Sequence, residues 1–267
     1  MEYKLIAMDF DGTLLKDDKT ISQKTKERLK TYKDLGYMIV GVTARTLNSA
    51  KDVVPLDIFN YIIINNGASI YNVKTDKILA SKEIPFEIAK KITEKLESHC
   101  IQIDFITEKN YNIYINKKKS NLDFIKDINT IDDLNEPIAR INLFLKNNED
   151  IEKCYEIITS NYNDVNCFIM QDSGDEKKWL VINPKNVNKA STLKELGEMK
   201  NISLSEMIYF GDGLNDLEVL QEVGLSVAMG NALEQVKKCT IYSTKTNNED
   251  GIIDFLDKKL NRQKVKK

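Results

Sequence analysis

Short apolar runs alternate with amphipathic stretches over the first 80 residues. The apolar runs predict three buried strands: Lys4–Met8, Tyr37–Val42 and Tyr61–Ile64. Between the first two, Ser22 can cap a helix that has Leu29 and Tyr32 on its inner face. Strands that alternate with helices are typical of a doubly wound parallel sheet. The pattern therefore predicts an α/β, Rossmann-like fold for this part of the chain.

The pattern changes between about Glu83 and Pro184. Five strand-like runs occur there: Ile101–Thr107, Tyr111–Asn116, Ile138–Leu145, Val165–Met170 and Trp179–Asn183. Three helical stretches lie among them: Phe86–Ser98, Asn121–Ile128 and Asp150–Asn161. Glu108-Lys109-Asn110 separates the first two runs and predicts a hairpin turn. This segment is typical of a separate α+β domain.

Strand and helix alternate again from Asn188 onward. The predicted elements are a strand Glu206–Phe210, a helix from Asp216, a strand Leu225–Met229 and a last helix Gly251–Leu260. The two ends of the chain therefore form one sheet, and the middle third is inserted between them. We expect a first domain made of residues 1–82 plus 186–267, and an inserted domain of residues 83–185.

Composition narrows the classes of partner. The 267 residues include 39 basic and 41 acidic side chains, and the net charge of −2 gives no reason to expect nucleic acid. No apolar run approaches the roughly 18–20 residues that span a bilayer, and the start of the chain lacks a signal-peptide pattern. The 4 cysteines have no paired spacing. We expect a cytoplasmic protein with no nucleic-acid or membrane partner.

The first predicted strand ends on two carboxylates, in Asp9-Phe10-Asp11-Gly12-Thr13-Leu14. In open α/β sheets, ligands bind at the carboxyl ends of parallel strands. Asp9 and Asp11 are two positions apart, so both can face one pocket while Phe10 faces away. One carboxylate can act as a nucleophile beside a hard cation, and the other can transfer protons. A strand followed by an ordinary Asp-Gly turn is the alternative interpretation.

Two further segments can bind an anion. Thr43-Ala44-Arg45 follows the second strand, where a hydroxyl and backbone N–H groups can bind a phosphate oxygen, although Thr43 can equally be a helix cap. Lys189 opens a predicted helix, where a cation opposes the helix dipole unless an anion lies above it. A solvated surface lysine is the alternative there.

The fourth segment, Gly211-Asp212-Gly213-Leu214-Asn215-Asp216, directly follows a predicted strand. Its glycines allow a tight loop and the close approach of a ligand. Mg²⁺ prefers a few carboxylate oxygens and shares a phosphate of the substrate. Asp9 and Asp212, each at a strand end, suit that requirement. An ordinary Asp-rich turn is the alternative; it explains the glycines, but not the convergence on the first motif that favours a Mg²⁺ site.

The four segments, in this order and at strand ends, together resemble the haloacid dehalogenase-like (HAD) hydrolase superfamily. The inserted domain resembles the C2B cap of its Cof-type subfamily IIB, and Asn65-Asn66-Gly67-Ala68 before it is also similar to that subfamily. The resemblance implies that residues 1–82 plus 186–267 are the catalytic core and residues 83–185 the cap. It also implies a phosphatase (hydrolase of phosphoric monoesters) that acts on small phosphorylated metabolites, most often sugar phosphates.

The resemblance implies a role for each matching residue. Asp9 would form an aspartyl-phosphate, and Asp11 would protonate the leaving oxygen and then activate water. Mg²⁺ would be held by Asp9, by the backbone carbonyl of Asp11 and by Asp212, and Asp216 would orient Lys189 or a water bound to the metal. The phosphoryl oxygens would be held by five groups: the N–H of Phe10, Thr43, the N–H of Ala44, Lys189 and Asn215.

One departure from the subfamily concerns Ala44, which stands where glycine is usual. If that position needs a positive φ, the alanine costs about 1 kcal/mol. Two other functions remain open: a phosphomutase of the same superfamily, and a non-catalytic regulator that binds phosphorylated metabolites. We expect a monomer by default.

Overall fold

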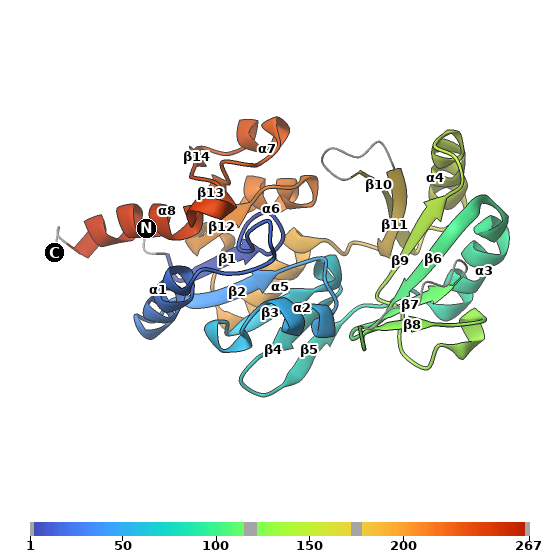
Figure 1. Cartoon of the computed structure of the whole chain (residues 1–267), viewed down its shortest axis with the longest axis horizontal. Helices are drawn as coiled ribbons and strands as arrows, with labels where there is room; N and C mark the ends of the chain where they lie inside the picture. The colour runs from blue at the N-terminus through green and yellow to red at the C-terminus, as the bar shows by residue number, and fades with distance from the viewer. Residues whose placement is uncertain (1–2, 115–121, 172–177, 265–267) are drawn as a thin grey trace. The chain divides into compact units, whose positions relative to one another are not determined.

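The computed structural model describes residues 3–114, 122–171 and 178–264 (Figure 1). Its contacts divide the chain into two units. The core unit comprises Met1–Ala44, Lys51–Leu79 and Asn188–Lys267, and the insert unit comprises Arg45–Ala50 and Ala80–Val187. The short segment Arg45–Ala50 thus groups with the insert unit, whereas the sequence predicts it in the first domain. The predicted domain limits, and the roles of core and cap, stay predictions.

The core unit contains an eight-stranded sheet in the order β14-β13-β12-β1-β2-β3-β4-β5. Its strands are β1 (Leu5–Asp9), β2 (Met38–Val42), β3 (Tyr61–Ile64), β4 (Ser69–Asn72), β5 (Lys77–Ser81), β12 (Met207–Gly211), β13 (Leu225–Ala228) and β14 (Tyr242–Ser243). Neighbours from β14 to β3 are parallel, and β3 pairs with β4 antiparallel. The predicted α/β fold is confirmed. Strands β4 and β5, which the sequence does not predict, extend the sheet beyond β3.

Strand β1 lies at the centre of this sheet, between β12 and β2, and all five of its residues are buried. Met8 is in register with Phe210, and Asp9 is in register with Val42. The carboxyl ends of β1, β2 and β12 therefore meet at one edge of the sheet. The loops that follow these three strands carry the predicted site residues.

Helices flank the core sheet (Figure 1). They are α1 (Gln23–Asp34), α2 (Leu47–Val53), α5 (Lys189–Lys200), α6 (Leu217–Glu222), α7 (Glu234–Lys238) and α8 (Gly251–Lys264); α2 is shared between the two units. Ser22 caps α1 as predicted, and it accepts a 3.0 Å hydrogen bond from the N–H of Thr25. Helix α8 is tied to α1 because Asp257 accepts a 2.7 Å hydrogen bond from the hydroxyl of Tyr32.

The insert unit contains a six-stranded sheet in the order β10-β11-β9-β6-β7-β8. Its strands are β6 (Cys100–Ile106), β7 (Tyr111–Tyr114), β8 (Ile125–Asp127), β9 (Arg140–Leu145), β10 (Val165–Gln171) and β11 (Lys178–Pro184). Helices α3 (Phe86–Leu96) and α4 (Glu149–Asn161) contribute to one apolar cluster with β6, β9, β10 and β11. Strands β6 and β7 pair antiparallel across the predicted hairpin turn.

The predicted helix Asn121–Ile128 is wrong. Ile125–Asp127 forms strand β8, which pairs parallel with the edge of β7. The N–H of Tyr111 donates to the carbonyl of Phe124 at 2.7 Å, so the sheet edge satisfies backbone groups that a helix would have paired internally. Residue 121, like the end of the predicted strand Tyr111–Asn116 beyond residue 114, lies outside the described residues.

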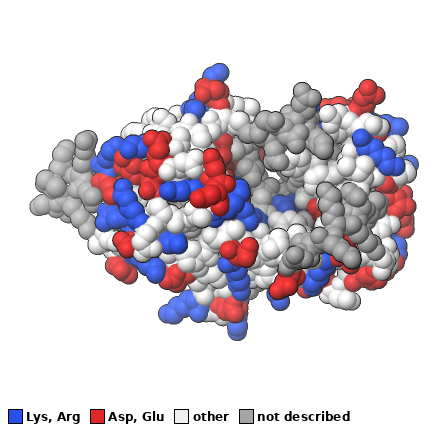
Figure 2. Space-filling model, viewed as in Figure 1, with Lys and Arg blue, Asp and Glu red and all other residues white. Residues whose placement is uncertain are grey.

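Charge is mixed over the surface. On the face shown in Figure 2, basic and acidic side chains are interspersed among the described residues, in keeping with the net charge of −2. Within the part of the chain that the structure describes, every helix is too short or too polar to cross a lipid bilayer.

Candidate active site

Asp9 is the last residue of β1, and the loop after it turns back at once. The N–H of Leu14 donates to the carbonyl of Asp9 at 3.2 Å. Gly12 has a φ of +77°, a backbone conformation that residues with a side chain rarely adopt. A Cβ at this position would lie 2.2 Å from Oδ2 of Asp212. The glycine of the first motif is therefore required twice, by its backbone conformation and by the side chain beside it.

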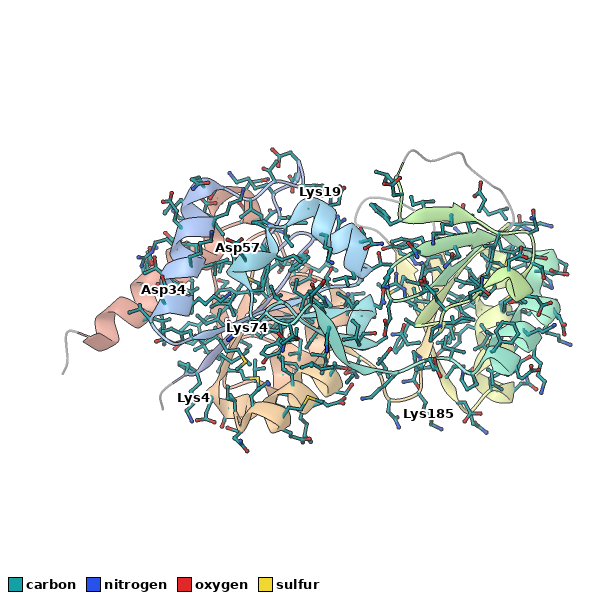
Figure 3. All side chains as sticks on the ribbon, turned by 90° about the horizontal axis from the view of Figure 1, so that it is seen from below. Lys4, Lys19, Asp34, Asp57, Lys74 and Lys185 are labelled. Atoms are coloured by element: carbon teal, nitrogen blue, oxygen red, sulfur yellow. The ribbon has the colours of Figure 1, made fainter. Side chains whose placement is uncertain are left out.

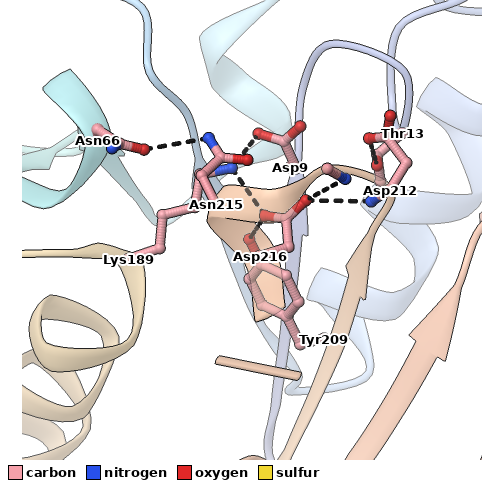
Figure 4. A network of polar contacts seen from close by, with 9 residues as sticks. Asp9, Thr13, Asn66, Lys189, Tyr209, Asp212, Asn215 and Asp216 are labelled. Carbon is pink, nitrogen blue, oxygen red and sulfur yellow. Dashed lines mark hydrogen bonds and ion pairs between the residues drawn. The ribbon is translucent and has the colours of Figure 1, made fainter. Parts of the chain in front are cut away.

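Asp212 approaches this turn from the neighbouring strand. Strand β12 ends at Gly211, one position before Asp212, and β12 pairs in parallel with β1. The hydroxyl of Thr13 donates to Oδ1 of Asp212 at 2.7 Å, over a separation of 199 residues (Figure 4). The pairing of β1 with β12 thus brings the first and fourth sequence segments together, as the strand-end argument predicts.

Lys189 lies between two carboxylates. Its Nζ is 2.7 Å from Oδ1 of Asp9 and 2.7 Å from Oδ1 of Asp216 (Figure 4). Its exposed fraction is only 1%, and that of Asp216 is 0%. Asn188 caps helix α5 by accepting a 2.7 Å bond from the N–H of Ser191, which fixes the start of the helix from which Lys189 projects. Two carboxylates supply the negative charge that a lysine at this helix terminus needs.

Asp216 forms hydrogen bonds with several groups of the fourth segment and of the strand before it. Its Oδ1 also accepts a 2.7 Å hydrogen bond from the hydroxyl of Tyr209, a residue of β12. Its Oδ2 accepts from the backbone N–H groups of Asp212 and Gly213, each at 3.0 Å. A buried carboxylate with both oxygens bonded in this way is held rigidly. It fixes Lys189 and the loop that carries Asp212.

The electrostatics of the cluster follow from its burial. Burial opposes the charge of Lys189, but Asp216 and Asp9 outweigh this effect and raise the pKa of its ammonium group. Burial, together with the neighbouring carboxylates of Asp216 and Asp212, raises the pKa of Asp9. Burial likewise raises the pKa of Asp212, to about 6. Such perturbed groups gathered at a strand end are typical of a functional site.

The cluster fits a divalent cation. Carboxylate oxygens of Asp9, Asp212 and Asp216 lie within 4.8 Å of one another. Asp216 is already bonded to Lys189, Tyr209 and two N–H groups, so Asp9 and Asp212 are the better ligands. Three carboxylates beside one ammonium leave an excess of negative charge, and carboxylate oxygens are what Mg²⁺ prefers. The type of donor and the charge of the cluster suit Mg²⁺.

The residues predicted to bind phosphate lie around the same edge. Thr43 directly follows β2, whose Val42 is in register with Asp9, and Thr43 is buried. Ala44 comes next, and its φ lies outside the left-handed region, so alanine in place of glycine brings no backbone strain. The ring of Phe10 is buried against Phe59, with ring centroids 5.4 Å apart.

Asn215 also lies at this edge (Figure 4). Its Nδ2 donates to Oδ1 of Asn66 at 3.1 Å. Asn66 follows β3 and has a φ of +59°, which asparagine adopts more readily than most residues. Hydrogen bonds thus join Asp9, Lys189, Asp216 and the backbone of Asp212, and Asn215 directly precedes Asp216 in the chain. Asp11 lies two residues after Asp9 and is partly exposed.

Three residues of the site had no predicted role. Thr13 belongs to the first motif, so its position beside a carboxylate could have been proposed from the sequence. Asn66 belongs to an Asn-Asn-Gly run, which signals an unusual backbone but gives no contact. Tyr209 lies within an apolar strand and carries no signal in the sequence. Its contact with Asp216 depends on the side of the sheet toward which the tyrosine side chain points.

Comparison with known proteins places these features in a family. A model of haloacid dehalogenase-like hydrolases matches residues 6–256. Two 5-amino-6-(5-phospho-D-ribitylamino)uracil phosphatases of Bacillus subtilis are similar. YitU is 30% identical over 94% of this chain and 96% of its own length. YcsE is 29% identical, with 94% of each chain covered. A haloacid dehalogenase-like hydrolase from Bacteroides thetaiotaomicron has a similar structure, with a TM-score of 0.82 and 26% identity over 96% of this chain and 99% of its own.

Proposed function

The chain belongs to the haloacid dehalogenase-like hydrolase family, in its Cof-type branch, and is a phosphatase; we propose that it is Mg²⁺-dependent and hydrolyses small phosphorylated metabolites through an aspartyl-phosphate on Asp9. The observation that carries this proposal is the position of Lys189, with Nζ 2.7 Å from both Asp9 and Asp216, beside Asp212. Phosphoryl transfer needs mainly positioning and positive charge around the transferred group, and this edge of the sheet can supply both.

In the first half-reaction, a carboxylate oxygen of Asp9 attacks the phosphorus. The bond from phosphorus to the leaving oxygen breaks, its electron pair goes to that oxygen, and Asp11 gives the oxygen a proton. Lys189, Thr43, Asn215 and the N–H groups of Phe10 and Ala44 bind the phosphoryl oxygens. When bound by Asp9, Asp212 and the carbonyl of Asp11, Mg²⁺ favours the ionised form of Asp9 and offsets the charge of the substrate.

In the second half-reaction, water attacks the phosphorus of the aspartyl-phosphate. Asp11, now ionised, takes a proton from that water, and the bond between phosphorus and Asp9 breaks. Inorganic phosphate leaves, and both aspartates return to their starting states. Asp216 keeps Lys189 in place through both halves, because three other hydrogen bonds, from the hydroxyl of Tyr209 and from two backbone N–H groups, fix its two oxygens.

The relatives support a substrate class. Two of them act on a phosphate ester of a ribityl chain, as their names state. We therefore place phosphorylated sugars and sugar alcohols, including 5-amino-6-(5-phospho-D-ribitylamino)uracil, first among the substrates to test. Substrates of this size need neither a nucleic-acid nor a membrane partner. We also propose a monomer in the cytoplasm, where the reduced state of its cysteines would be maintained.

Phosphate release from a panel of metabolites tests the proposal. The panel holds 5-amino-6-(5-phospho-D-ribitylamino)uracil, several hexose and pentose phosphates, pyridoxal phosphate and flavin mononucleotide, each with Mg²⁺ or with EDTA. We expect release that requires Mg²⁺ and is fastest with a sugar or sugar-alcohol phosphate. Release that is unchanged in EDTA would contradict the metal requirement. Isomerised product in excess of free phosphate would indicate a phosphomutase instead.

A further inference from the structure

Lys19 has an unusual backbone conformation. Its φ is +63°, in the left-handed region, which costs a residue with a side chain roughly 1–2 kcal/mol. Glycine or asparagine would relieve this cost in a turn. Such a departure from local preference is a reason to look for a function of the side chain.

The turn that carries Lys19 is held in place on both sides. Asp18 accepts hydrogen bonds from the N–H and the hydroxyl of Thr20, at 2.9 and 2.6 Å. Asp17 accepts from the side-chain amides of Asn247 and Asn248, at 3.0 and 2.8 Å. The turn is thus anchored to a distant segment of the core unit. Lys19 projects from a fixed backbone rather than from a free loop.

The side chain of Lys19 reaches the motif after β1. Its Nζ lies 2.9 Å from Oδ1 of Asp11, and the exposed fractions of the two side chains are 54% and 41%. Lys19 lies at the surface of the core unit (Figure 3). An exposed pair of this kind contributes roughly 0–1 kcal/mol to stability, no more than the cost of the backbone at Lys19. The ion pair alone therefore does not offset the cost of the backbone at Lys19; the hydrogen bonds that hold the turn contribute the rest, and they leave the Nζ of Lys19 aimed at Asp11.

We infer that Lys19 is a positioning residue, which holds the carboxyl group of Asp11 where it can exchange a proton with the leaving oxygen and later with water. This inference rests on the proposed function of Asp11. A carboxyl group that is two-fifths exposed can turn about its side-chain bonds, and proton transfer needs it within hydrogen-bond reach of the reacting oxygen. The ammonium group of Lys19, 2.9 Å from Oδ1 of Asp11, restricts that rotation, and because the pair is exposed and weak it allows the carboxyl group to move when substrate binds.

The chemistry of the leaving group separates this role from a structural one. The oxygen leaving an alkyl phosphate, such as a sugar phosphate, needs a proton as its bond to phosphorus breaks. The oxygen leaving p-nitrophenyl phosphate is a stable phenolate and needs none. A residue that positions the proton donor therefore matters for the first substrate and little for the formation of the aspartyl-phosphate from the second. A residue that only maintains the fold affects both equally.

The experiment compares Lys19→Met, Lys19→Arg and Asp11→Asn with the wild type, and uses Lys24→Met, an exposed lysine of α1, as the control. For each, the rate of the first half-reaction is measured in a single turnover with a sugar phosphate and with p-nitrophenyl phosphate. We expect Lys19→Met to lose about tenfold or more with the sugar phosphate and less than about threefold with p-nitrophenyl phosphate. Lys19→Arg should restore most of the loss, and Lys24→Met should match the wild type.

If Asp11→Asn shows the dependence on leaving group but Lys19→Met does not, Lys19 has no positioning role, while the proposed function stands. If Asp11→Asn loses activity equally with both substrates, Asp11 is not the proton donor, and the inference about Lys19 falls with it. If Lys19→Met loses activity equally with both substrates, its effect is structural.

Discussion

The ammonium nitrogen of Lys189 lies 2.7 Å from Oδ1 of Asp216, although the two residues are 27 positions apart and both are buried. Asp9 contacts the same nitrogen at the same distance. One cation thus joins the residue that ends β1 to the loop that follows β12. Lys189 therefore stabilises the arrangement of the buried carboxylates, and its ammonium group is placed to bind the phosphoryl oxygens as we propose.

Replacing Lys189 by methionine should affect stability and activity together. The change leaves buried carboxylates without their cation, so we expect the free energy of unfolding to fall by about 3–5 kcal/mol in EDTA. Added Mg²⁺ should restore part of this loss. The rate of phosphate release should fall by about a hundredfold or more. Denaturant unfolding with and without Mg²⁺ measures the first effect. Lys194→Met, on the exposed side of the same helix, is the control, and equal stability of the two variants would contradict the account.

Replacing Gly12 by alanine should weaken the metal site. The new Cβ would meet Oδ2 of Asp212 at 2.2 Å, so that carboxylate must move. We expect the Mg²⁺ concentration for half-maximal activity to rise by about tenfold or more, as metal sites respond to displaced groups near their ligands. Gly36 is the matched control, because its φ is +95° but nothing lies within 4 Å of an added Cβ. Gly36→Ala should cost about 1 kcal/mol of stability and leave the Mg²⁺ dependence unchanged; a parallel shift in both variants would show that backbone strain alone is responsible.

Asp104 of β6 should make the stability of the insert unit depend on pH. Burial raises the pKa of its carboxyl group from 3.8 to about 6, against the opposing effect of a 2.8 Å hydrogen bond from Gln102. Between about pH 4 and pH 6 the folded chain keeps a proton that the unfolded chain releases, so the free energy of unfolding falls as pH rises through this window. Above it, the ionised group costs up to about 3 kcal/mol.

Asp104→Asn removes that titration. Its melting temperature should exceed that of the wild type by more at about pH 8 than at about pH 4. Calorimetry at the two pH values gives the comparison, and Asp127→Asn, an exposed residue of the same sheet, should show no such difference. A gain for Asp104→Asn that is the same at both pH values would mean that the carboxyl group is ionised equally in the folded and unfolded chains.

The strands at the centre of the core sheet could be predicted because burial on both faces leaves continuous apolar runs, as in β1 and β3. Strand β5 could not, because its residues alternate between exposed and partly buried at the sheet edge. The prediction for the region of β8 was wrong for a related reason. Three residues at an edge carry too little pattern to distinguish a strand from a helix, and their state is decided by pairing with β7.

Some contacts of the candidate site could likewise be predicted from the sequence, and others could not. Asp9, Asp212 and Lys189 could be predicted to meet because the ends of parallel strands and the start of a helix share one edge of an open sheet. The contacts of Tyr209 and Asn66 depend on side-chain direction, which the sequence does not reveal. The bond between Lys19 and Asp11 depends on a turn that is anchored to Asn247 and Asn248, more than 200 residues away.

Trapping the phosphorylated enzyme would identify the nucleophile. Asp11→Asn is mixed with p-nitrophenyl phosphate and Mg²⁺ and quenched in acid, and the phosphorylated peptide is identified by mass spectrometry. We expect a burst of about one nitrophenol per enzyme and a phosphoryl group on Asp9, with neither in a variant that also carries Asp9→Asn. A phosphoryl group on any other residue, or an unchanged burst in the variant that also carries Asp9→Asn, would contradict Asp9 as the nucleophile.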